Sequence, residues 1–246
     1  GGMTGDSWNG FSGGSQQLPV GDNPAGLTVG DFDGDNDVDI AVANTDDDSI
    51  SLFENETSAR GLVTFNTHTP IAADYYTDQY VDVKPTDVTT GNFSDSGHVD
   101  LAIANSGDSM MVIVEGPIFA SGLMPSGGQY DAPGGADQID PGDTTNPKDL
   151  DVITATGGGG KTSSFKGTTA LAAAYGEPTV LDMGNSISEQ LVIDLDGNGQ
   201  DDIIVADPDS NAISIALQNV DGTFGTPARL QLDAPLVGGY FSPRSI

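Results

Sequence analysis

The 246-residue sequence contains no cysteine, one tryptophan and only seven lysines and arginines. Without cysteine no disulfide can hold the fold together, and bound metal ions are the usual alternative staple. No apolar run approaches the roughly 18 residues of a membrane-spanning helix, so we expect no membrane insertion. With 37 acidic residues the formal net charge is −30, and such a surface repels nucleic-acid phosphates and anionic membranes.

Glutamate is also scarce: it accounts for five of the 37 acidic residues, and the other 32 are aspartate. The chain has 34 glycines and 14 prolines, which imply many turns, and no long segment has the 3.6-residue apolar period of a helix. A short carboxylate suits tight loops, where it caps turns or ligates hard cations. The composition therefore directs attention to what the aspartates bind.

One 15-residue stretch recurs along the chain, at 30–44, 91–105 and 193–207, with a weaker copy at 143–155. The last Asp of the loop in each copy stands at 39, 100, 151 and 202, which gives spacings of 61, 51 and 51 residues. A fixed period of this size indicates one supersecondary unit repeated in series.

Each unit carries several strand-like segments around its loop. An apolar run follows the loop (Asp39–Ala43, Asp202–Ala206), then a polar turn and an alternating strand (Ser49–Phe53, Ala212–Leu217). A glycine-rich turn with an aromatic residue, 221–227 in the last full unit, closes the unit. Several short strands in a repeat of about 40–60 residues predict the blade of a β-propeller.

The order Phe-Gly-x-Pro, strand, Gly-Asp-Phe-Asp-Gly-Asp, Asp-Ile-Ala-Val-Ala, strand resembles FG-GAP/VCBS repeats, the blades of integrin-α-type propellers. The resemblance covers about residues 8–241 and is closest in the first and fourth units. It implies an all-β propeller of four-stranded blades with calcium in the loops of some blades. It also implies roles in adhesion, in matrix or surface-layer assembly, and in carbohydrate or protein recognition.

We expect a single domain, 1–246, with units at about 11–64, 65–122, 123–164 and 165–223 and a partial unit at 224–246. The segment 7–11 resembles the end of a preceding blade, so it is expected to complete the last blade of a ring of four or five blades. Two alternatives stay open: the chain is part of a larger ring, or its half-blades meet between subunits.

The first loop places five aspartates at alternate positions 1, 3, 5, 7 and 9. They are Asp31, Asp33, Asp35, Asp37 and Asp39. Alternate side chains converge on one point, position 7 offers its carbonyl, and Gly34 permits the sharp turn. Converging carboxylates repel one another unless a cation neutralises them, and this number of oxygen ligands favours Ca²⁺ over Mg²⁺.

The loop of the fourth unit has the same form, with predicted calcium ligands Asp194, Asp196, Asn198, Gln200 (through its carbonyl) and Asp202. An EF-hand is the alternative interpretation of both loops, but it needs a bidentate Glu at position 12. Val42 and Val205 stand there, both within strand-like runs. The loops therefore connect strands.

The loops of the second and third units are degenerate. In 92–100 only Asp100 remains as a carboxylate at a ligand position, and in 143–151 Pro147 and Lys148 disrupt the pattern. We expect weak or no calcium binding at either loop.

Enzymatic signals are weak, and we expect no enzyme. The segment 155–162 fits a loose phosphate-loop pattern, but 163–169 has the composition of a turn and not of the helix that a phosphate loop opens. His68 and His98 are expected in solvated turns, and no Gly-x-Ser-x-Gly elbow accompanies them.

The expected protein is a secreted or surface-exposed, calcium-binding propeller that acts as a binding, adhesion or structural module. Its expected partners are calcium and a protein or carbohydrate outside the cell. Two further functions stay open: a self-associating subunit of an extracellular filament or surface layer, and an accessory domain of a polysaccharide-degrading enzyme.

Overall fold

The computed structural model describes residues 3–4, 7–8, 16–56, 63–73, 82–94, 97–119, 127–142, 151–155, 159–166 and 177–232. Apart from the single 3-10 turn η1 (Thr45–Asp47), the elements of this part are β-strands. They form four antiparallel sheets of four or five strands and one two-stranded sheet, so the all-β prediction is confirmed. No helix among the described residues has the length and apolarity to cross a membrane.

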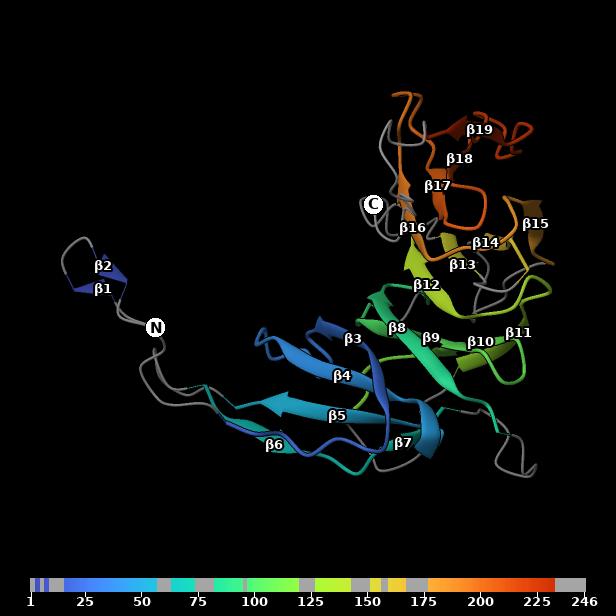
Figure 1. Ribbon diagram of the computed structural model, residues 1–246. Coiled ribbons are helices and arrows are strands. Elements are labelled where there is room, and N and C mark those ends of the chain that lie inside the picture. Colours follow the sequence, from blue (N-terminus) through green and yellow to red (C-terminus); the bar gives the residue numbers. More distant parts are fainter. Residues whose placement is uncertain are drawn as a thin grey trace.

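The four sheets follow one another along the chain, as blades do (Figure 1). Sheet 1 contains β3 (Pro24–Gly30), β4 (Asp39–Asn44), β5 (Ser49–Asn55), β6 (Phe65–Thr67) and the short β7 (Ile71–Ala72). Sheet 2 contains β8 (Pro85–Gly91), β9 (Asp100–Asn105), β10 (Met110–Val114) and β11 (Gly127–Asp131). Sheet 3 contains β12 (Gln138–Pro141), β13 (Asp151–Ala155), β14 (Lys161–Lys166) and β15 (Thr179–Asp182). Sheet 4 contains β16 (Glu189–Ile193), β17 (Asp202–Asp207), β18 (Ala212–Ala216) and β19 (Ala228–Gln231).

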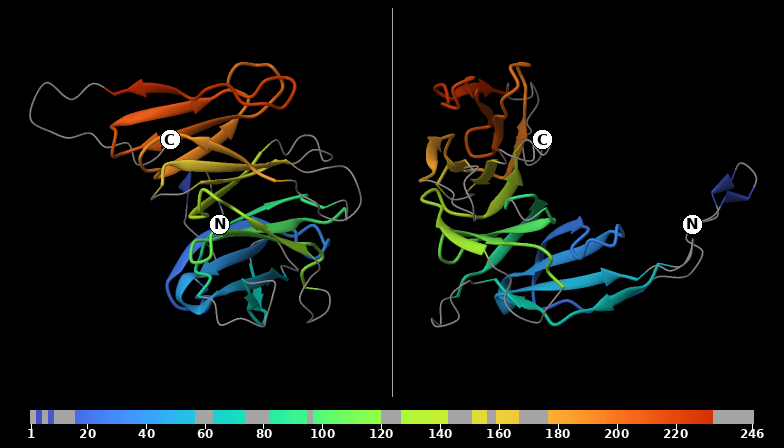
Figure 2. Two further views of the ribbon diagram at one scale, coloured as in Figure 1. Left: turned by 90° about the vertical axis from the view of Figure 1, so that its right-hand side faces the viewer. Right: turned by 180° about the vertical axis from the view of Figure 1, so that it is seen from behind.

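The sheets stack face to face in an arc, with sheet 1 at one end and sheet 4 at the other (Figure 2). Their first strands are neighbours in series: β3 adjoins β8, β8 adjoins β12, and β12 adjoins β16. Apolar side chains fill the spaces between consecutive sheets as three separate clusters. Each sheet is thus one repeat of the sequence, and the core lies between repeats.

The aromatic residues at which two predicted units begin lie inside the sheets. Phe65 begins β6, the fourth strand of sheet 1, and Phe165 lies fully buried in β14. Within the segment 163–169, predicted as a turn, residues 163–166 instead lie in strand β14, which pairs with β13 and β15, and residues 167–169 lie outside the described residues. No phosphate-binding helix follows the glycine run in the described chain.

Only residues 7 and 8 of the segment expected to complete the last blade are described, so its closure of a ring stays a prediction. β2 (Ser7–Trp8) pairs with β1 (Met3–Thr4) in a two-stranded sheet, and no described strand of sheet 4 pairs with it. Residues 9–11 of the predicted strand and the partial unit beyond 232 lie outside the described residues. Among the described residues the four sheets form an open arc and not a closed ring.

A buried carboxylate begins the second strand of sheets 1, 2 and 4. These residues are Asp39, Asp100 and Asp202, whose exposed fractions are 1%, 0% and 0%. One oxygen of each accepts from a loop N–H, at 2.8 Å from Phe32, 2.7 Å from Ser94 and 2.9 Å from Leu195. The other accepts from an N–H at the end of the third strand, at 2.8 Å in every case, from Asn55, Gly116 and Gln218. The carboxylate therefore joins three segments of each sheet.

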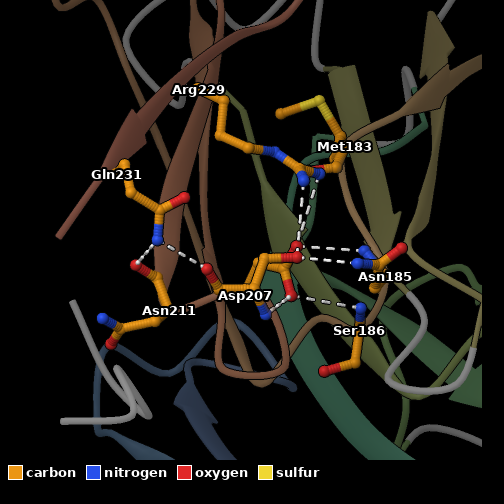
Figure 3. Close-up of polar contacts among 8 residues, drawn as sticks. Met183, Asn185, Ser186, Asp207, Asn211, Arg229 and Gln231 are labelled. Carbon is orange, nitrogen blue, oxygen red and sulfur yellow. Dashed lines mark hydrogen bonds and ion pairs between the residues drawn. The ribbon is translucent and has the colours of Figure 1, made fainter. Parts of the chain in front are cut away.

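A second polar residue ends the second strand and holds the segment that enters the sheet. Asn44 accepts at 3.1 Å from the N–H of Gly21, and Asp207 accepts at 3.0 Å from the N–H of Asn185. Figure 3 shows Asp207 at the centre of this network, with the Arg229 guanidinium 3.4 Å away. Burial opposes the charge of Asp207, but hydrogen bonds from Ser210, Asn185 and Ser186 outweigh it and hold its pKa below the usual value.

Carboxylates also link consecutive sheets along their first strands. Asp87 on β8 accepts at 3.1 Å from the N–H of Ile139 on β12, and Asp140 on β12 accepts at 3.2 Å from the N–H of Val192 on β16. The first strand of a sheet has an unpaired edge, so these carboxylates satisfy donors that its own sheet leaves open. Burial, together with the nearby charges of Asp87 and Glu189, raises the pKa of Asp140 to about 6.

Replacing Asp100 tests the structural role of the buried carboxylate separately from metal binding, because Asp100 lies in the second loop, where we expect weak or no calcium binding. Asp100→Ala leaves the N–H groups of Ser94 and Gly116 without their acceptor, and we expect a loss of about 3 kcal/mol in the free energy of unfolding. Asp100→Asn keeps one acceptor oxygen and should lose less. Denaturant titration measures both, with the exposed turn variant Asp209→Ala as the matched control. An Asp100→Ala protein as stable as the wild type contradicts the assigned role.

The raised pKa of Asp140 predicts a pH-dependent stability. The folded state holds this proton more tightly than the unfolded chain, so the penalty for charging Asp140 appears as pH rises from 3.8 to about 6. Asp140→Asn removes the penalty. With allowance for solvent screening, it should raise the free energy of unfolding at pH 7 by about 1–2 kcal/mol. Below about pH 4 it should leave the free energy of unfolding unchanged, because Asp140 is then uncharged in both states. Thermal melts across this range, with the exposed Asp182→Asn as control, measure the difference. The same Tm for the wild type and Asp140→Asn at pH 7 would contradict the prediction.

Candidate metal centres

Two of the four predicted loops fold alike, residue by residue. In the first, Asp31 accepts from the N–H groups of Gly34 (2.7 Å) and Asn36 (3.0 Å). In the fourth, Asp194 accepts from Gly197 (2.7 Å) and Gly199 (2.9 Å), three and five residues further on as before. The two loops therefore reach the same conformation with different residues.

Left-handed backbone shapes these loops at two positions. Gly34 and Gly197 have φ of +87° and +78°, and Asn36 and Gly199 have φ of +73° and +82°. Glycine and asparagine tolerate this region, so both loops can turn tightly enough to bring their first and last carboxylates together. The sequence predicts this convergence from the spacing of eight residues between the first and last aspartate of each loop.

Each loop gathers three carboxylates. Oxygen atoms of Asp31, Asp33 and Asp39 lie within 4.8 Å of one another, and so do those of Asp194, Asp196 and Asp202. The last member of each triad is the buried carboxylate that begins the second strand, and the others project from the exposed loop. We call these groups the first triad and the fourth triad. Either can hold a metal ion through oxygen ligands.

Burial, followed by the charges of neighbouring aspartates, raises pKa values in the first triad. Desolvation, with the charges of Asp35 and Asp39, raises the pKa of Asp33 to about 6. Desolvation also raises the pKa of Asp39, although the N–H groups of Asn55 and Phe32 oppose the rise. A cation at this point would favour the charged form of each group.

The other predicted ligands are not part of either triad. The carboxylate of Asp35 accepts from the N–H of Asp37 at 2.7 Å. The side-chain amide of Asn198 donates to the Gln218 carbonyl at 2.8 Å, and that of Gln200 donates to the Gly199 carbonyl at 2.7 Å. Their place in a coordination shell stays a prediction.

The degenerate loops differ from the two triads. Asp100 holds the structural position, but the residues around it form no group of three carboxylates or histidines within the described chain. The third loop, through residue 150, lies outside the described residues.

Glu54 is a neighbour of the first triad that the sequence did not suggest. Its carboxyl is hydrogen-bonded to Asp33, and its Oε2 lies 2.7 Å from Nε2 of His68. Glu54 lies beside Asn55, whose N–H caps Asp39, so it reaches the loop only after β5 has paired with β4. The expectation of a solvated His68 is wrong: its ring is 31% exposed and stacks on Phe119, with centroids 4.3 Å apart. His98 is exposed, as expected.

Comparison with known proteins gives a likeness to solved structures but not to any family. No family model matches the sequence, and no curated protein matches it. The fold is similar to the crystal structure of AztD from Citrobacter koseri, with 15% sequence identity and a TM-score of 0.48. The match covers 87% of this chain and 48% of that chain, so this chain spans about half the length of AztD. At this level of similarity the likeness says nothing of ligands or function.

Proposed function

We propose that this chain is a calcium-binding, propeller-type scaffold of FG-GAP/VCBS character that works outside the cell as a non-enzymatic binding or structural module. One observation carries the proposal. The first and fourth triads share their backbone conformation, their hydrogen-bond pattern and their place at the start of the second strand. The first and fourth units have the same loop although two other units lie between them, and a ligand common to both loops best explains this.

The chemistry of the triads supports calcium as that ligand. All the converging donors are hard carboxylate oxygens, and nitrogen or sulfur donors are absent from both triads. Ca²⁺ accepts six to eight such oxygens in flexible geometry, whereas Mg²⁺ demands a tight octahedron and keeps its waters. Carbonyl groups of the exposed loops and water would complete the shell.

The position of the triads supports a structural role for the ion. Each triad joins an exposed loop to the buried first residue of a second strand, so an ion bound there ties the loop to the sheet. Extracellular modules bind calcium with dissociation constants of about 10⁻⁴–10⁻³ M, a range that suits a site of three carboxylates on an exposed loop. The high acidic charge suits a soluble protein outside the cell.

Calorimetric titration of chelator-treated protein tests the ligand and the number of sites. We expect two Ca²⁺ ions per chain and much weaker binding of Mg²⁺. Asp33→Asn should remove one site and Asp196→Asn the other, whereas Asp46→Asn, an exposed acidic residue outside both triads, should remove neither. A titration without heat at either site contradicts the calcium assignment.

The same ions should stabilise the fold. At a free calcium concentration one hundred times the dissociation constant, each site adds about 2.7 kcal/mol, which corresponds to a rise of about 5–10 °C in Tm. Differential scanning calorimetry with calcium and with chelator measures the shift. The Asp33→Asn and Asp196→Asn variants should each keep only part of it, and an unchanged Tm in the wild type would falsify the structural role.

A further inference from the structure

Glu54 reaches the first triad from outside its loop. It is the penultimate residue of β5, and the next residue, Asn55, donates at 2.8 Å the N–H that caps Asp39. The carboxyl group of Glu54 is hydrogen-bonded to that of Asp33. A fourth carboxyl group, supplied by a strand that follows the loop, is therefore in contact with the first triad.

Groups that are not acidic fix the position of Glu54. Its Oε2 lies 2.7 Å from Nε2 of His68, and the His68 ring stacks on Phe119 with centroids 4.3 Å apart. Phe119 in turn meets Phe32, the buried second residue of the first loop, edge to face at 6.0 Å. The Glu54 side chain is 22% exposed. Carboxylates that bind metal ions are commonly held by a second hydrogen bond of this kind.

The contact between Glu54 and Asp33 brings two acidic groups together where water is partly excluded. Two charged carboxylates in contact repel each other, and the repulsion is stronger where the surroundings are less polar. A divalent cation at the first triad would relieve it. The ion would then gain the attraction of Glu54 in addition to that of the three aspartates.

The fourth triad differs at the position of Glu54. The residue before the N–H that caps the structural carboxylate is Glu54 in sheet 1 and Leu217 in sheet 4. The strand register gives the same equivalence, since in both sheets the preceding residue pairs with the one that follows the structural carboxylate. Leu217 is 41% exposed, and its side chain has no ligand atom. The two loops share their backbone, so the two sites differ in their side chains.

We propose that Glu54 is a fourth carboxylate of the first metal site, so that the first site binds calcium more tightly than the fourth and fills before it. This inference rests on the proposed function, because it adds a residue to one of the sites proposed there. Calcium affinity depends on the number of charged ligands and on their rigidity. Even with the dielectric constant of water, one carboxylate about 6 Å from a divalent ion changes binding about tenfold.

Calorimetric titration with Ca²⁺ tests the assignment one site at a time. Asp196→Asn leaves the first of the two proposed sites, and in this background Glu54→Gln should weaken binding about tenfold. Glu56→Gln is the matched control, because Glu56 is exposed two residues further along and its replacement removes the same charge. It should change the affinity by less than about twofold, since exposed charges are screened.

The reverse change is made at the fourth site and leaves Glu54 untouched. Asp33→Asn leaves the fourth site, and in this background Leu217→Glu should tighten calcium binding about three- to tenfold, because it places a carboxylate at the equivalent position. Leu217→Gln is the matched control without the charge and should not tighten binding. Circular dichroism confirms that each variant is folded.

The outcomes separate this inference from the calcium proposal. If both sites bind calcium but Glu54→Gln binds as tightly as Glu56→Gln, the role of Glu54 is overturned and the proposed function is intact. The same holds if Leu217→Glu binds no more tightly than Leu217→Gln, or if the first site measured alone is no tighter than the fourth. A wild type that binds no calcium overturns both proposals.

Discussion

The fold depends on one repeated interaction: a buried carboxylate that accepts two backbone hydrogen bonds at the start of a second strand. Asp39, Asp100 and Asp202 each join the loop before that strand to the end of the third strand. A buried charge is costly unless its hydrogen bonds are complete, so this residue permits only one arrangement of the three segments. The two hydrogen bonds fix the loop before the second strand and the point at which the chain leaves the third strand.

The proposed metal binding would be an addition to this arrangement. In sheets 1 and 4 the structural carboxylate has two further aspartates beside it, and the three oxygens converge. In sheet 2 the carboxylate remains while the other acidic ligands have been replaced, and the sheet keeps its four strands. The fold of sheet 2 therefore needs no metal triad, because the hydrogen bonds of Asp100 join the same three segments without one.

The local features of this fold were predictable, and the contacts between repeats were not. The triads and the strands that follow them depend on residues two to eight positions apart, so their pattern is visible in the chain. Glu54 reaches Asp33 only through the pairing of β5, and Asp87 meets the N–H of Ile139 across 52 residues. The boundaries between repeats were also not predictable. Phe65, where the sequence suggests that a new repeat begins, starts β6, the fourth strand of sheet 1.

The two described triads occupy sheets 1 and 4, and among the described residues each of these sheets has one neighbouring sheet. In a linear array an inner repeat is held by two neighbours and an end repeat by one, so opening begins at the ends. Under the proposed function, ions bound at sheets 1 and 4 would tie each of these sheets to its exposed loop and oppose fraying there. Withdrawal of calcium would loosen the chain from both ends inward and leave the middle pair of sheets as the last part to open.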